Sequence, residues 1–250
     1  MKTKDLHSIV SVGIPVGSLL LCTIFALIGS EAYYRFILYD EGGYLEHSTV
    51  LMLIPSVVMA FWMFAHRERF PNSWVGAWAL LMALGALYFA GEEASWGQNY
   101  IGWATPDWWQ ALNDQGETNI HNTHGVFDHL PRFFLTCASI VACILPLAVY
   151  RRRKTWDEAK DWREWIFPTM ASFPIALITA LVGLPQKLYR HYGDKEDAVY
   201  EWFDARFLRG HHSELKEHFF AMFILIYVLS LFYRYYQFYQ RQPESPAQDS

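Results

Sequence analysis

Residues 74–99 read WVGAWALLMALGALYFAGEEASWGQN, a long apolar run that ends in two adjacent glutamates and a polar segment. A helix needs about 20 apolar residues to cross the hydrocarbon core of a bilayer. The run therefore predicts a transmembrane helix over residues 74–95. Carboxylates are costly at the mouth of a membrane bundle, so Glu92 and Glu93 mark a candidate functional site.

Apolar runs of similar length recur along the chain and indicate the fold class. They predict one all-α domain over residues 1–242, a polytopic membrane helix bundle with six transmembrane helices. The predicted spans are about 9–30, 46–65, 74–95, 133–150, 165–185 and 215–236. Pro168, Pro174 and Pro185 interrupt the fifth span, which we therefore expect to be kinked. Residues 243–250 are polar and are expected to form a disordered tail.

The composition fits a membrane protein whose polar loops dilute its apolar spans. Of the 250 residues, 53% are hydrophobic and 18% are charged, yet the mean hydropathy is only +0.06. The net charge of −5 comes without a basic face, which argues against binding of nucleic acid. The glycine patterns of nucleotide sites and the Gly-x-Ser-x-Gly pattern of serine hydrolases are also missing.

Basic residues concentrate in one set of loops, whereas the alternate loops are acidic or mixed. The basic set is Lys2, Lys4, Arg67, Arg69, Arg151, Arg152, Arg153, Lys154, Lys160, Arg163, Arg234 and Arg241. Because cytoplasmic loops are enriched in lysine and arginine, both termini are predicted to be cytoplasmic. The acidic loops then lie on the periplasmic or extracellular side of a bacterial inner (plasma) membrane. In one of them, residues 106–112 predict a short surface helix.

The two glutamates open the polar segment of that loop. Ser95, Trp96 and Asn99 follow Glu92 by three, four and seven residues. In a continuous helix these side chains would share one face with Glu92, so at least one carboxylate would face the bundle. Glu92 and Glu93 are therefore the candidate catalytic residues. Alternatively, both lie at the level of the lipid head groups and are simply solvated.

Two Glu-x-x-x-His pairs supply the candidate metal ligands, Glu117 with His121 and Glu214 with His218. Residues four apart share a face of a helix, where a carboxylate and an imidazole can hold one ion. Such oxygen and nitrogen ligands suit a divalent metal cofactor: zinc, iron or manganese. The remaining candidate binding residues lie near these pairs or open a neighbouring span: Glu46, Ser95, Trp96, Gln98, Asn119, Asn122, His124 and Glu217. The asparagines could instead hold the loop against the bundle.

The polar segment resembles a signature of uncharacterised bacterial polytopic membrane proteins. The signature is carried by Gly91-Glu92-Glu93-Ala94-Ser95-Trp96-Gly97-Gln98 and by Asn113-x-Gln115-x-Glu117-x-Asn119-x-His121-Asn122. Ala94 and Asn99 depart from it. The resemblance implies a membrane location and no particular activity. A more distant comparison is with the ceramidase-like membrane hydrolases, zinc enzymes with a histidine pair on a late helix, where this chain has Glu214 and His218.

The leading functional hypothesis is an integral inner-membrane protein with an outward-facing pocket of Glu, His and Asn residues. It would be a metal-dependent hydrolase or transferase whose partners are the lipid bilayer and a lipid or lipid-linked substrate. One alternative is a non-enzymatic membrane subunit or a proton/cation-coupled transporter, although transport sites are typically near the bilayer midplane. Another is that the polar segment only fastens the loop to the bundle.

Overall fold

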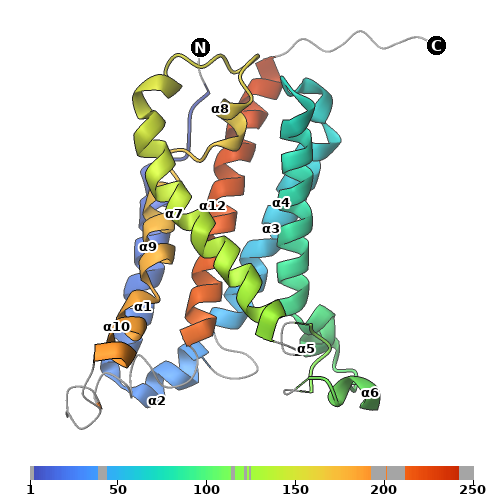
Figure 1. Cartoon of the computed structure of the whole chain (residues 1–250), viewed down its shortest axis with the longest axis vertical. Helices are drawn as coiled ribbons and strands as arrows, with labels where there is room; N and C mark the ends of the chain where they lie inside the picture. Colours follow the sequence, from blue (N-terminus) through green and yellow to red (C-terminus); the bar gives the residue numbers. More distant parts are fainter. Residues whose placement is uncertain are drawn as a thin grey trace.

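The computed structural model describes residues 3–38, 44–113, 116–120, 123, 125–192, 201 and 212–241, which form helices and loops without a strand (Figure 1). The predicted tail, residues 243–250, lies outside the described residues. The long helices are α1 (Ile14–Ile28, continuing a π-helical turn over Ile9–Gly13), α3 (Tyr44–Ala65), α4 (Ser73–Glu93), α7 (Gly125–Arg153) and α12 (His212–Arg241). The shorter helices are α2 (Ser30–Tyr33), α5 (Gln98–Ile101), α6 (Asp107–Gln110), α8 (Arg163–Ile166), α9 (Phe173–Leu181) and α10 (Leu184–Tyr192). The short helix predicted within residues 106–112 is confirmed, since α6 begins directly after Pro106.

Five helical segments are long and apolar enough to cross a membrane: Ile9–Ile28, Tyr44–Ala65, Ser73–Glu93, Gly125–Arg153 and Glu214–Arg241. They coincide with five of the six predicted spans. The all-α prediction is confirmed for the described residues, and the five apolar helices support a multi-pass membrane protein.

The span predicted over residues 165–185 is divided into pieces, so the count of six stays a prediction. Phe167 is extended (φ −73°, ψ 133°), as expected for a residue that precedes a proline, and α8 ends there. The chain becomes helical again at α9, where Pro174 occupies the first turn. We expected a kinked helix, but the prolines break it. In Figure 1, α8 lies at the end of the molecule where α12 finishes, and α10 lies at the opposite end.

Helix α12 is the central helix of the bundle. In its most apolar stretch 67% of the residues are buried, against 17% to 33% in the other four candidate spans. Its fully buried Val228 and Leu231 pack with Ala79 and Ala83 of α4. Small residues at such contacts let helices approach closely in a membrane. The outer helices leave large apolar side chains exposed, as expected for surfaces that face lipid.

A buried ion network fastens α8 to its neighbours at the end of the molecule where α12 finishes. Glu164 of α8 lies 3.2 Å from Arg153 of α7 and 3.4 Å from Arg234 of α12. Arg153 also donates to the backbone carbonyls of Phe167 and Pro168, at 3.1 and 2.9 Å. The arginine therefore satisfies acceptors that the break in the helix would otherwise leave unpaired. We call Arg153, Glu164 and Arg234 the basic-end network.

Candidate functional site

The polar segment after α4 begins with a tight left-handed turn. Ser95, Trp96 and Gly97 have φ of 45°, 54° and 104°. The turn brings the Trp96 ring back over Gly91, where an added side-chain carbon would lie 2.8 Å from the ring. Only glycine therefore fits at position 91. The prediction that Glu92, Ser95, Trp96 and Asn99 share one face of a continuous helix is wrong, because α4 ends at Glu93.

Because of this turn, the two adjacent glutamates contact different parts of the protein. Glu92 is 3% exposed and faces the loop. Its carboxylate accepts from Trp96 Nε1 at 2.8 Å and from the backbone N–H of Ile120 at 2.7 Å. Glu92 thus ties the end of α4 to the loop, whereas Glu93 lies with side chains of another helix.

Further hydrogen bonds tie the same loop to itself. Glu117 accepts from Ser95 Oγ at 2.8 Å and from Asn119 Nδ2 at 2.5 Å. Gln98 donates to Thr105 Oγ1 at 2.7 Å, and its oxygen accepts from the backbone N–H of Thr118, also at 2.7 Å. Buried Asn113 donates to the Asn119 carbonyl at 3.0 Å. The α4–α7 loop network comprises Glu92, Ser95, Trp96, Gln98, Asn113, Glu117 and Asn119. It favours the interpretation that these residues fasten the loop.

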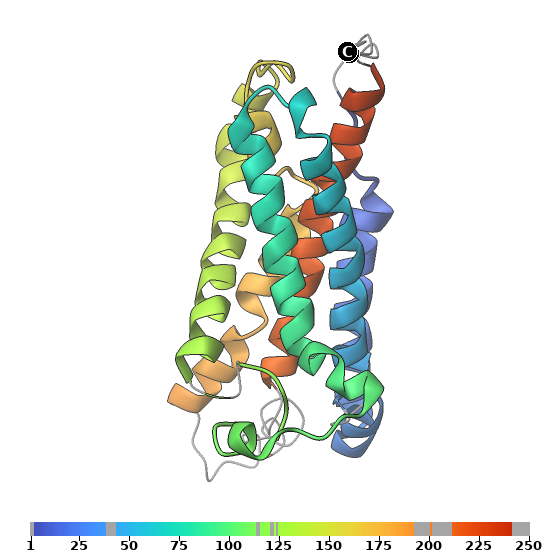
Figure 2. The same ribbon diagram turned by 90° about the vertical axis from the view of Figure 1, so that its right-hand side faces the viewer.

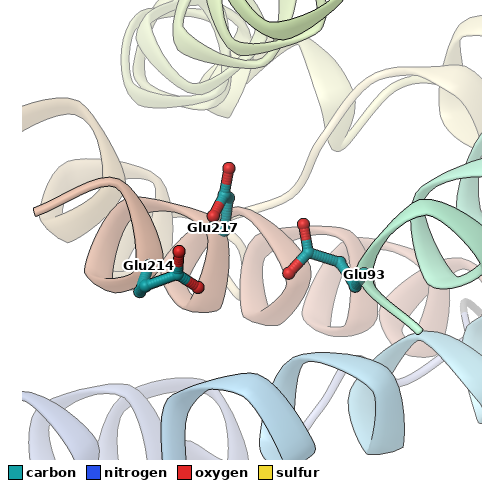
Figure 3. Close-up of side chains that lie close together, drawn as sticks. All are labelled: Glu93, Glu214 and Glu217. Atoms are coloured by element: carbon teal, nitrogen blue, oxygen red, sulfur yellow. The ribbon is translucent and has the colours of Figure 1, made fainter. Parts of the chain in front are cut away.

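Glu93 lies beside two glutamates of α12 (Figure 3). Glu93, Glu214 and Glu217 each offer an oxygen within 4.8 Å of the others, the one arrangement among the described residues that could hold a metal ion. Glu217 is buried and also accepts from Arg132 Nε of α7 at 2.9 Å. Neither Glu93 nor Glu214 accepts a hydrogen bond from the described part of the chain. We call Glu93, Glu214 and Glu217 the carboxylate cluster.

The donor atoms of this cluster indicate which ion it could hold. Three carboxylates offer hard oxygen ligands, which suit magnesium or manganese better than zinc. Close carboxylates also repel one another, and Arg132 offsets only one of the three charges. A divalent cation would offset the remaining two.

His218, a predicted metal ligand, does not belong to the carboxylate cluster. It is fully buried, and its two ring nitrogens lie 2.7 Å from Ser18 Oγ of α1 and 2.8 Å from Ser48 Oγ of α3. Both nitrogens are therefore occupied by hydroxyl groups. This arrangement favours a structural role in which His218 joins α12 to α1 and α3, and its role as a metal ligand stays a prediction.

Glu46 is another predicted site residue, and it lies outside the carboxylate cluster. Glu46, at the start of α3, accepts from Asn99 Nδ2 at 3.0 Å. Burial and the charge of Glu46 raise the pKa of the Tyr100 hydroxyl, which lies 3.4 Å from His47 Nδ1. His121, Asn122 and His124 lie outside the described residues, so the pairing of Glu117 with His121 stays a prediction.

An apolar cavity of about 680 Å³ extends away from the cluster between α4, α7 and α12, helices that Figures 1 and 2 show side by side. All its charged lining residues, Glu92, Glu93, Arg132 and Glu217, belong to one end. Several apolar lining residues, such as Phe134 and Val141, are among the large exposed apolar side chains. The cavity is therefore an open groove on the side of the bundle, a surface that would face lipid if these helices cross a membrane. We call it the α4–α7 groove.

Sequence reasoning missed Arg132 and the groove. Arg132 lies in a loop that is otherwise acidic, directly before the apolar run that begins at residue 133. An arginine at that position was the signal from which its role could have been predicted. The groove had no comparable signal, because its lining residues are the same apolar types that face lipid elsewhere.

No protein-family model, curated protein or solved structure matches this chain. The fold therefore defines the class of protein, an all-helical chain with five helices that could cross a membrane. Any more specific function must be inferred from the groove and the carboxylate cluster.

Proposed function

We propose that this protein is a metal-dependent hydrolase or transferase that acts on a lipid or lipid-linked substrate. The substrate's hydrocarbon chain would lie in the α4–α7 groove, and its head group would meet the carboxylate cluster. The observation that carries the proposal is the groove itself, because it is apolar along its length and charged at one end. That distribution matches an amphiphile.

The occupant of the groove follows from where the groove opens. Apolar cavities do not hold water, and a void forfeits dispersion contacts along its lining. A lateral opening among lipid-facing side chains gives hydrocarbon direct access. A lipid chain is therefore the occupant that best fits the groove.

The chemistry would belong to the carboxylate cluster. A magnesium or manganese ion held by Glu93, Glu214 and Glu217 can activate a water molecule or polarise an ester or phosphoryl oxygen. Arg132 would bring a positive charge to an anionic head group, because it lines the charged end of the groove and contacts Glu217. Zinc and iron, the other expected metals, are less suited to ligands that are all carboxylates.

The adjacent glutamates provide a matched test of this assignment. Glu93→Gln should lower the affinity for Mn²⁺ by about tenfold or more, with little loss of thermal stability, because it removes a ligand. Glu92→Gln should keep the Mn²⁺ affinity but lower the thermal stability, because a Gln side chain cannot accept at both oxygens. Elemental analysis and Mn²⁺ titration of the detergent-purified variants measure both effects.

The same two variants also test whether Glu93 takes part in catalysis. With lipid substrates and Mn²⁺, Glu93→Gln should lose head-group release while Glu92→Gln retains it. Equal Mn²⁺ affinity in the wild type and Glu93→Gln would contradict the metal assignment. A Glu93→Gln variant that releases head groups at the wild-type rate would contradict the catalytic one.

The orientation in the membrane is part of the proposal. The predicted cytoplasmic loops place Arg69 and Arg241 at one end, where Arg69 donates to the Tyr239 carbonyl and Arg241 pairs with Glu158. Both termini would then be cytoplasmic, and the carboxylate cluster periplasmic, in a bacterial inner membrane. A reporter active only in the periplasm should be silent when fused after residue 250. Activity of that fusion would reverse the orientation.

A proton/cation-coupled transporter or a non-enzymatic subunit has less support. A transport path would need polar groups along its length, whereas the groove beyond the cluster is lined by apolar side chains. A non-enzymatic subunit would pair its carboxylates with an arginine of a partner protein. In this chain Glu217 is already paired with Arg132, so a partner's arginine is less needed.

A further inference from the structure

Two hydrogen-bonded aromatic side chains, Trp78 and Tyr227, line the α4–α7 groove at the end away from the carboxylate cluster. Trp78 Nε1 of α4 donates to the Tyr227 hydroxyl of α12 at 2.6 Å. The Tyr227 hydroxyl donates in turn to the Ile166 carbonyl of α8, also at 2.6 Å. Both polar groups are therefore satisfied. With these groups paired, the two rings present apolar surface to this end of the groove, which we call the floor.

Helix α4 runs along the groove from this floor to the carboxylate cluster. Trp78, Met82, Gly85, Phe89 and Glu93 all line the cavity, at spacings of three or four residues. An α-helix rises 1.5 Å per residue, so the distance along α4 from Trp78 to Glu93 is about 22 Å. From Gly85 to Glu93 it is about 12 Å. The groove thus has a defined length, with its charged end fixed by Glu93.

Gly85 leaves space in the middle of this length. A side-chain carbon added at Gly85 would meet no atom within 4 Å. The helix gains no close helix–helix contact from this glycine, although glycine is a poor helix former. Its effect on the structure is an unobstructed groove between the cluster and the floor.

We infer that the groove selects its substrate by chain length, accepting one unbranched hydrocarbon chain of up to about 22 Å along α4, with Trp78 as the residue that sets the upper limit. This inference rests on the proposed function, because it names the substrate class of the same site. Trp78 and Gly85 are specificity-determining residues. The head group of the substrate would carry an anionic group for Arg132 or the metal ion.

Two substitutions should move the length limit in opposite directions. Gly85→Phe fills the groove at mid-length and should shift binding to chains about 12 Å long. Trp78→Ala removes one of the two side chains of the floor and should admit longer chains, while the Tyr227 hydroxyl keeps its bond to Ile166. Gly17→Phe is the matched control, because Gly17 of α1 also has open space around it and lies outside the groove.

The probe is an equimolar mixture of lysophosphatidylethanolamines with saturated chains of graded length, from decanoyl to tetracosanoyl, so that the longest chains exceed the expected limit of the wild type. Detergent-purified wild type and variants are equilibrated with the mixture, and the bound species are quantified by native mass spectrometry. Overpacking by one methylene group costs enough to exclude a chain about fivefold or more. Gly85→Phe should therefore bind the stearoyl species at least that much less than Gly17→Phe does.

The outcomes separate the inference from the proposed function. If the wild type and Gly17→Phe bind no lysolipid of any length, both fail. If they bind lysolipids but Gly85→Phe and Trp78→Ala leave the chain-length distribution unchanged, only the length selection is overturned. Thermal unfolding of each variant checks folding, and Trp78→Ala still tests the inference if Gly85→Phe does not fold.

Discussion

Replacing Arg132 by methionine should lower the free energy of unfolding by about 3 kcal/mol, the lower end of the range for breaking a buried ion pair. Methionine keeps the apolar stem of the side chain but removes the guanidinium group and its charge. Glu217 would then be buried beside Glu93 and Glu214 with its counter-charge gone. The lower end is expected because the Arg132 side chain is 27% exposed. Denaturant unfolding in detergent micelles measures the loss.

Two further variants test the reason for this loss. Arg151→Met changes an exposed arginine of the same helix and should have little effect, because exposed charges contribute little to stability. Arg132→Met combined with Glu217→Gln should recover part of the lost stability, because the charge that the arginine had offset is then also removed. If Arg132→Met is as stable as Arg151→Met, the Arg132–Glu217 pair is not a significant part of the folded state.

The same variant bears on the metal proposal. A cation that binds only the folded state stabilises it by an amount that increases with the logarithm of the cation concentration relative to its Kd. Mn²⁺ should therefore stabilise Arg132→Met more than the wild type, because the variant has one positive charge fewer to repel the ion. Equal stabilisation of both proteins would mean that the ion binds away from the carboxylate cluster.

The sequence predicts the helices of this protein better than its site. An apolar run long enough to cross a bilayer has few alternatives to a helix, because every backbone polar group must be satisfied within the segment. The exception is the segment around Pro168, where the Arg153 side chain of α7 donates to the backbone carbonyls of Phe167 and Pro168. That compensation depends on a side chain distant in sequence, so no local pattern could reveal it.

The two glutamates show why the site could not be assigned from periodicity. Helical spacing requires that the helix continue, but Ser95 and Trp96 adopt left-handed conformations that non-glycine residues rarely take. Glu92 is thereby turned toward the loop and Glu93 toward α12. The partners of His218 illustrate the same limit, since Ser18 and Ser48 are 200 and 170 residues away in the sequence.

Replacing Glu164 by glutamine should cost more stability than replacing Arg132, about 3 to 5 kcal/mol. The side chains of Glu164 and Arg234 are only 6% and 4% exposed, so solvent screens their charges little. Glutamine keeps the size and one acceptor of Glu164 but leaves the guanidinium groups of Arg153 and Arg234 without the carboxylate between them. Thermal and denaturant unfolding in detergent micelles should show the loss.

The control for this prediction lies three residues earlier. Asp161→Asn removes the same charge from a pair with the exposed Arg163 and should leave stability nearly unchanged. Because the basic-end network is remote from the carboxylate cluster, the folded fraction of Glu164→Gln should bind Mn²⁺ with the wild-type affinity. A variant that stays as stable as Asp161→Asn would show that α8 is held by its apolar contacts. Loss of Mn²⁺ affinity in the folded protein would instead mean that the two ends of the bundle are coupled, and that the groove between them transmits the change.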